Sequence, residues 1–104
     1  MRSHEWIDRR SLALHERVAA KLEADPALLE TARANVERWL CSTPSAALIE
    51  WRRLLRDTPP PEILALLRSR GEIATRLRQS SPFAGVLTPE ERRAILAEYE
   101  SPSA

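Results

Sequence analysis

The chain has 104 residues, of which 43% are hydrophobic and 30% charged, and these values describe a single globular domain and exclude an intrinsically disordered chain. The formal net charge is +1, and the isoelectric point near 8.0 lies below the value of about 9 that is typical of nucleic-acid-binding domains. No apolar run approaches the roughly 18 residues of a membrane span, and the initial MRSHEWIDRR lacks the apolar core of a signal peptide, so we expect a cytoplasmic protein.

The first predicted helix runs from about residue 8 to 24, because small and apolar residues recur there at steps of three and four. Its inward stripe is Ile7, Ser11, Leu14, Val18 and Leu22. A second helix is expected over 26–41, since Asp25 before Pro26 combines an N-cap side chain with a proline whose missing N–H is not needed. Thr43 before Pro44 repeats this signal and predicts a third helix over about 44–56.

Three shorter helices should follow. The fourth must begin at or after Pro60, because a residue that precedes proline avoids the α region. A break at Gly71 separates it from a fifth helix over 72–79, with Ile73 facing inward. The segment Thr88-Pro89-Glu90-Glu91 carries a capping box, which predicts a last helix that runs from Pro89 to about Tyr99.

The fold predicted from these elements is all-α, either a small bundle or a partly extended arrangement of five to six short helices. No segment alternates with a period of two over a useful length, so a sheet has no support. We expect one domain over 1–104, with frayed ends at 1–7 and 100–104. Trp39 and Trp51 lie on inward stripes and are predicted core residues, whereas Trp6 is either a helix staple or a contact with a partner.

Side chains that could carry catalysis do not form a recognised pattern. His4 and His15 lack the H-E-x-x-H spacing of a metal site, and His15 is predicted to be solvated on a helix face. Cys41 is predicted to be a buried small residue, and Ser80-Ser81 lacks the G-x-S-x-G pattern of a nucleophile elbow. We therefore expect no enzymatic activity, no metal, no cofactor and no small-molecule substrate.

Arginines are frequent enough to raise the question of nucleic-acid binding. Basic residues on the third, fourth and fifth helices are interleaved with acidic ones such as Glu50 and Glu72, which indicates a solvated face with salt bridges. Gly71 is a candidate for the turn of a helix-turn-helix motif, with Thr75, Arg76 and Gln79 facing outward. A helical DNA-binding regulator is therefore the alternative function, and we otherwise expect only weak DNA binding.

The stretch RLRQSSPFAGVLTPEER, residues 76–92, holds the only phenylalanine, Phe83, and one of the two glycines, Gly85. Both residues fall in the connection between two predicted helices. Three interpretations stay open at this point: a catalytic loop, a turn that closes the core, or a segment shaped to fit a partner.

Together with IDRRSLALHERVAAKLEADPALLETARANVERW near the N-terminus and ALIEWRRLL in the middle, this stretch resembles a family of small helical bacterial antitoxins. The similarity covers nearly the whole chain. It is greatest to the antitoxin partner of MenT-type nucleotidyltransferase toxins, from mycobacterial toxin–antitoxin modules. The resemblance implies a protein that neutralises, by direct binding, a toxin that adds nucleotides to transfer-RNA acceptor ends.

The contact with such a toxin is expected in the connection around Phe83, which a proline-fixed turn would preorganise for binding. The predicted contact residues are Arg76, Arg78, Gln79, Ser80, Ser81, Pro82, Phe83 and Gly85. Arg78 is expected to be exposed. The N-terminal helix around Trp6, Arg9 and Arg10 is the other candidate contact. The alternative that Phe83 folds inward and closes the end of the bundle stays open.

Overall fold

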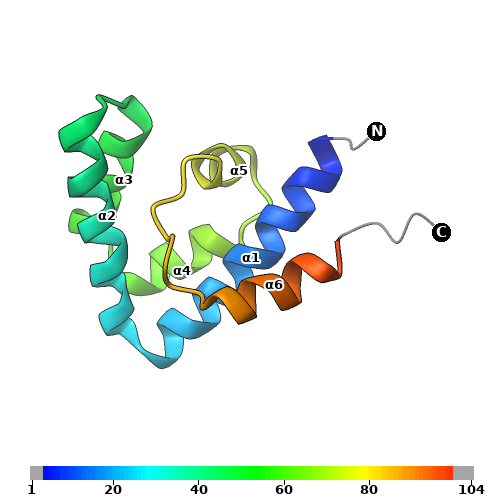
Figure 1. Ribbon diagram of the computed structural model, residues 1–104. Coiled ribbons are helices and arrows are strands. Elements are labelled where there is room, and N and C mark those ends of the chain that lie inside the picture. Colours follow the sequence, from blue (N-terminus) through cyan, green and yellow to red (C-terminus); the bar gives the residue numbers. More distant parts are fainter. Residues whose placement is uncertain (1–3, 100–104) are drawn as a thin grey trace.

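The structure, a computed structural model, describes residues 4–99, which form six α-helices and no strand (Figure 1). The α-helices are α1 (His4–Ala24), α2 (Leu29–Ser42), α3 (Ala46–Asp57), α4 (Pro60–Arg68), α5 (Glu72–Arg78) and α6 (Pro89–Ala97), and a short 3-10 helix η1 (Pro26–Leu28) precedes α2. α2 and α3 form an antiparallel pair at one side, while α1 packs against α4, α5 and α6 (Figure 1). The all-α prediction is confirmed.

The start of α1 lies earlier than predicted. It begins at His4, so residues 4–7 are helical rather than frayed. The fraying expected for 1–3 and 100–104 lies outside the described residues. Val18 and Leu22 of the predicted inward stripe are buried, whereas Ile7 is 43% exposed and the other buried positions of α1 are His15 and Ala19.

Two other helices begin later than predicted. Asp25 accepts from the Ala27 N–H at 3.3 Å as predicted, but the first residues form η1 and the α-helix begins at Leu29. The third helix begins at Ala46, since the Ser45 hydroxyl accepts the Leu48 N–H at 3.2 Å. Thr43 instead ends α2, with its N–H donating to the Trp39 carbonyl at 3.0 Å.

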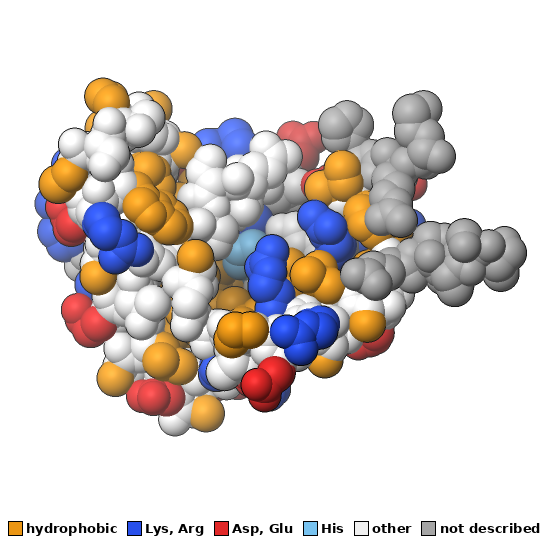
Figure 2. Space-filling model, viewed as in Figure 1, with side chains coloured by type: hydrophobic (Ala, Val, Ile, Leu, Met, Phe, Trp, Pro, Cys, Tyr) orange, Lys and Arg blue, Asp and Glu red, His pale blue; other side chains and the backbone are white. Residues whose placement is uncertain are grey.

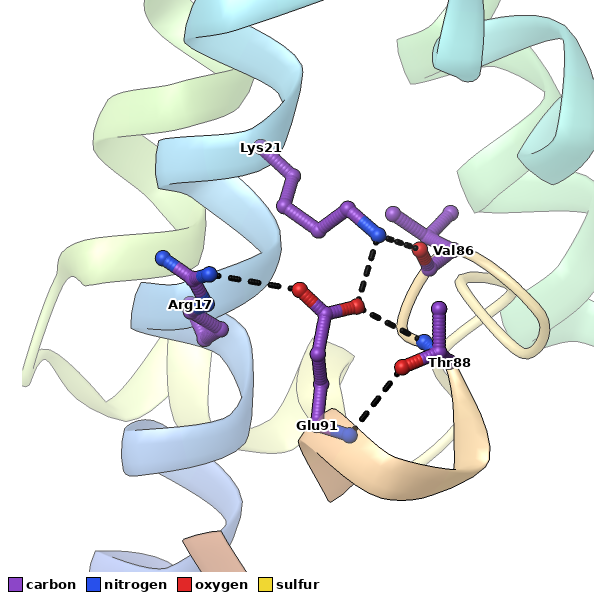
Figure 3. A network of polar contacts seen from close by, with 5 residues as sticks. All are labelled: Arg17, Lys21, Val86, Thr88 and Glu91. Atoms are coloured by element: carbon purple, nitrogen blue, oxygen red, sulfur yellow. Dashed lines mark hydrogen bonds and ion pairs between the residues drawn. The ribbon is translucent and has the colours of Figure 1, made fainter. Parts of the chain in front are cut away.

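The capping box at the start of α6 is confirmed and also attaches α6 to α1 (Figure 3). The Glu91 N–H donates to the Thr88 hydroxyl at 3.0 Å, and the Thr88 N–H donates to the Glu91 carboxylate at 2.8 Å. The same carboxylate accepts from Lys21 at 2.7 Å and from Arg17 at 3.2 Å. The hydrogen bond from Lys21, followed by that from the Thr88 backbone, lowers the pKa of Glu91 to about 2.

The core lies between α1, α2, α3 and α4 and is closed by residues that follow α5. Its buried members are Val18, Ala19, Leu22, Leu29, Ala32, Val36, Trp51, Leu55, Ile63, Leu67, Leu77, Phe83 and Val86. Trp51 is fully buried, as predicted, and its indole N–H donates to the Leu77 carbonyl at 2.9 Å. Trp39 is only half-buried, and Ile73, predicted to face inward, is 66% exposed.

The segment 79–88 between α5 and α6, here called the connector, descends between α2 and α1 (Figure 1). From α2, the Asn35 side-chain amide donates to the carbonyls of Pro82 and Ala84, both at 2.8 Å. From α1, the Lys21 ammonium donates to the Val86 carbonyl at 2.8 Å. The connector is therefore bonded on both sides to helices that are distant in the sequence.

We predict that Phe83→Ala destabilises the fold by about 3–5 kcal/mol, because it empties a packed core position. Phe83 is 4% exposed and stands edge-on to Trp51, with ring centroids 5.5 Å apart. Urea denaturation followed by circular dichroism measures the loss. Gln79→Ala is the control, since Gln79 is exposed in the same connector and should change stability by less than about 0.5 kcal/mol. An unchanged midpoint for Phe83→Ala would contradict the core assignment.

Candidate functional site

The central residues of the predicted contact face the interior. Pro82 is fully buried, Phe83 is 4% exposed and Ser81 is half-buried. Of the interpretations left open, the turn that closes the core is therefore the one that the structure supports. The turn itself needs Gly85, whose φ of +90° lies in the region that other residues rarely adopt.

Arg78 is not exposed, contrary to the prediction. It is 6% exposed and donates to the carbonyls of Leu66 at 3.3 Å and Ser69 at 2.6 Å. These carbonyls lie at the C-terminal end of α4, where the last backbone carbonyls of a helix have no hydrogen-bond donor within the helix. Arg78 thus closes the C-terminal end of α4, and burial lowers the pKa of its guanidinium. Its Nε is buried and has no hydrogen-bond partner among the described residues.

The other predicted residues of this region lie closer to the surface. Arg76 is exposed but forms a double hydrogen bond with Glu50 at 3.1 and 3.2 Å. Gln79 and Gly85 are exposed and Ser80 is half-buried. The structure therefore does not gather the predicted contact residues of the connector into one surface.

The predicted solvent exposure of His15 is wrong, because its side chain is 7% exposed. Its Nδ1–H donates to the Ser11 carbonyl at 2.7 Å, and its Nε2 accepts from the Ser81 hydroxyl at 2.8 Å. Burial lowers the pKa of His15 to about 4, against the opposing effect of the Ser11 hydrogen bond, and the positive charge of Arg78 adds to the lowering. The spacing of Ser11, His15, Val18 and Leu22 could have placed His15 on the inward stripe.

The Ser81–His15 pair has the hydrogen bond of a nucleophile and its base. An imidazole with a pKa near 4 is a weak base at neutral pH. The Ser81 hydroxyl also accepts the Phe83 N–H at 3.3 Å, within the connector. What the pair does in this structure is attach the connector to the middle of α1.

The N-terminal candidates do lie together. On the first turns of α1, the Arg10 guanidinium is placed over the Trp6 ring, 5.1 Å from its centroid. Arg9 is exposed, and Ile7, 43% exposed, lies beside them. We call Trp6, Ile7, Arg9 and Arg10 the α1 contact surface. Figure 2 shows Lys and Arg side chains interspersed with hydrophobic ones over α1 and α6.

The described surface has clefts between α2 and α3 and between α1 and α5. The α2/α3 cleft has a volume of about 480 Å³, and buried Val36 and Leu55 are among its lining residues. The α1/α5 cleft has a volume of about 450 Å³, and its lining residues include Asp8, Leu12, Glu16, Thr75, Arg78 and Tyr99. The second cleft brings together Arg9 and Arg78, which the sequence analysis placed in separate candidate contacts.

Within residues 4–99, no group of three or more His, Cys, Asp or Glu side chains is arranged to hold a metal ion. Cys41 is exposed rather than buried as predicted. None of the described helices is long and apolar enough to cross a membrane. No known protein family, curated protein or solved structure matches this chain.

We predict that stability falls on mild acidification because of His15. Its pKa is about 4 in the folded chain and 6.5 as a free side chain, so between these values the unfolded chain binds a proton that the folded chain does not. The free energy of unfolding should therefore drop by about 2 kcal/mol between about pH 7.5 and about pH 5. This window lies above the range in which Glu91, with its pKa near 2, loses its charge.

Urea denaturation at several pH values measures this slope. His15→Gln, whose amide oxygen can accept from Ser81, should remove most of it. An NMR titration of His15 gives an independent reading of its pKa. A midpoint near the ordinary value of 6.5 would show that the imidazole is not held neutral by burial.

Proposed function

We propose that this chain is an antitoxin that binds and neutralises a nucleotidyltransferase toxin, and that the α1 contact surface makes the main contact. The resemblance of the sequence to antitoxins of this class supports the kind of partner. The observation that carries the choice of surface is the stacked pair Arg10–Trp6 beside Ile7, an isoleucine that is 43% exposed.

The composition of this surface is that of a binding hot spot. Tryptophan and arginine are the residue types most enriched at such sites. Arg10 lies over the Trp6 ring at 5.1 Å and so restricts both side chains before binding. Restriction in advance lowers the entropy cost of forming a complex. Arg9 and Ile7 add a charge and an apolar area on the same turns of α1.

In this proposal the connector does not contact the toxin and instead stabilises the fold that carries the α1 contact surface. A partner cannot reach Phe83, which is 4% exposed, without opening the core. A partner cannot reach Arg78 either, because it is 6% exposed. In this proposal both residues act through the stability of the fold, and the toxin touches α1.

We predict that Trp6→Ala and Arg10→Glu each raise the dissociation constant for the toxin at least about thirtyfold, which corresponds to about 2 kcal/mol. The toxin to be tested is the product of the neighbouring gene, co-expressed and captured with the tagged chain. Binding is measured by calorimetry, and rescue of growth from the toxin is scored in parallel.

Arg53→Glu is the matched control, because Arg53 is exposed on α3, at the other side of the molecule from the start of α1 (Figure 1). It makes the same charge reversal as Arg10→Glu and should leave binding unchanged. Wild-type affinity in both α1 variants, with an intact fold, would place the contact elsewhere. If the wild-type chain neither captures the neighbouring product nor rescues growth, the antitoxin proposal fails.

The second candidate is a DNA-binding regulator, and one observation favours it. α4 and α5 are joined by residues 69–71, a short turn that contains Gly71, as in a helix-turn-helix motif. The residues that would contact DNA are not free to do so, however. Thr75, expected to face outward, is half-buried and donates its hydroxyl to the Gly71 carbonyl at 2.9 Å, while Arg76 is paired with Glu50.

We expect only weak and salt-sensitive DNA binding, with a dissociation constant of about a micromolar or weaker at about 150 mM salt. The net charge of +1 allows little release of counterions from DNA. Fluorescence anisotropy with the DNA upstream of its own gene tests this, without toxin present. A nanomolar complex that Arg70→Glu abolishes would favour the regulator.

A further inference from the structure

Of the six described α-helices, α6 is the one that contributes least to the packed interior. Each of the other five contains at least two buried residues, whereas α6 contains none. Within residues 4–99, neither the hydrophobic core nor the half-buried side chains packed against it include a residue of α6. A helix of nine residues is marginal in water by itself. The helical state of α6 therefore depends on contacts outside the core.

The bonds that join α6 to α1 converge on one carboxylate (Figure 3). Glu91 accepts from Lys21 at 2.7 Å and from Arg17 at 3.2 Å. The side chains of Lys21, Arg17 and Glu91 are 23%, 52% and 24% exposed, and ion pairs that water reaches contribute little to stability and are screened by salt. With a pKa of about 2, Glu91 is charged at neutral pH. The attachment of α6 should therefore respond to ionic strength rather than to mild acidification.

The position of α6 places it next to the α1 contact surface. Near its start, Glu91 binds Lys21 in the second half of α1. Beyond its end, the half-buried Tyr99 lines the α1/α5 cleft together with Arg9 and Leu12 from the first half of α1. α6 thus runs antiparallel to α1, on the outside of the molecule (Figure 1). Because Arg9 belongs to the α1 contact surface, the part of α1 that α6 covers adjoins that surface.

The boundary between α6 and the fixed part of the chain lies at residues 87–88. Val86 is buried and its carbonyl accepts from Lys21, and Leu87 packs against the core. The bonds of Thr88, by contrast, are made to Glu91, three residues along the same helix. The capping box would therefore move together with α6. A rotation of the chain at residues 87–88 separates α6 from α1 without breaking a contact of the core.

We infer that α6 is a displaceable lid, which opens at residues 87–88 while the rest of the fold stays intact, and that Glu91 controls the opening through its ion pairs with Arg17 and Lys21. Opening exposes the side of α1 that carries these two residues, next to the α1 contact surface. The inference rests on the proposed function only in that the exposed side of α1 becomes available to the toxin.

Amide hydrogen exchange of the full isotope-labelled chain, followed by NMR at neutral pH, tests the opening without any partner. We expect the α6 amides to have protection factors at least about a hundredfold lower than those of Leu22 in α1 and Leu55 in α3. Raising the salt concentration from about 0.05 M to about 0.5 M should lower the protection of α6 severalfold further. Protection of α6 equal to that of Leu22 and Leu55 would overturn the inference, because α6 would then open only when the whole chain unfolds.

Glu91→Gln tests the role of the carboxylate. The glutamine oxygen can still accept the Thr88 N–H and keep the capping box, but the charge that attracts Arg17 and Lys21 is lost. Protection of α6 should fall about three- to tenfold, with Leu22 and Leu55 unchanged. Glu90→Gln is the matched control, since Glu90 is exposed on the same turn and makes no ion pair within residues 4–99. An equal fall at α6, Leu22 and Leu55, or an equal effect of both variants, would contradict the inference.

Toxin binding is measured separately on the same two variants. If the toxin binds the open form, Glu91→Gln should lower the dissociation constant by the factor by which it lowers the protection of α6, and Glu90→Gln should not change it. An unchanged dissociation constant in Glu91→Gln would show that the toxin does not use the side of α1 under α6. Opening of α6 without toxin capture removes the proposed function alone, and toxin capture with a fully protected α6 removes this inference alone.

Discussion

The connector runs between α1 and α2 without regular secondary structure, and only Pro82, Phe83 and Val86 of it are buried. Its carbonyl groups therefore need donors from side chains, and the position of the neighbouring helices depends on these bonds. Asn35 of α2 donates to the carbonyls of Pro82 and Ala84, and Lys21 of α1 donates to that of Val86. A buried carbonyl left without a partner costs about 1–3 kcal/mol. Because these donors come from two helices, the same bonds fix how the α2–α3 pair sits against α1. Phe83 then packs on Trp51 of α3 and completes the core.

Features encoded by neighbouring residues could be predicted from the sequence, and features that depend on distant residues could not. The capping box needs only Thr88 and Glu91, three positions apart, and it is present as expected. The His15–Ser81 bond joins residues 66 positions apart, and the Asn35–Pro82 bond joins residues 47 positions apart. No local pattern reports such pairs. A polar residue on a predicted inward stripe, such as Asn35 between Ala32 and Val36, is the one signal that the sequence contained.

The residue pattern of 76–92 reflects the internal contacts of the connector more than a contact with a partner. Arg78 closes the end of α4, Ser81 bonds to His15, and Gly85 adopts a positive φ. Side chains that make these internal contacts have few hydrogen-bonding groups available to a partner. The α1 contact surface was harder to define because Ile7 was assigned to the buried stripe, whereas it is 43% exposed.

In the proposed complex, partner binding by α1 depends on the stability of the connector. The second half of α1 is bonded to the connector through His15 and to α6 through the Lys21–Glu91 ion pair. These bonds also fix the position of the first half of the helix. Contact residues on such a helix are held in place before binding, which a loop would not achieve at the same entropy cost. Loosening the connector would therefore weaken partner binding even if the partner never touches it. A variant of Phe83, Ser81 or Arg78 that loses binding identifies a contact residue only if its free energy of unfolding is unchanged.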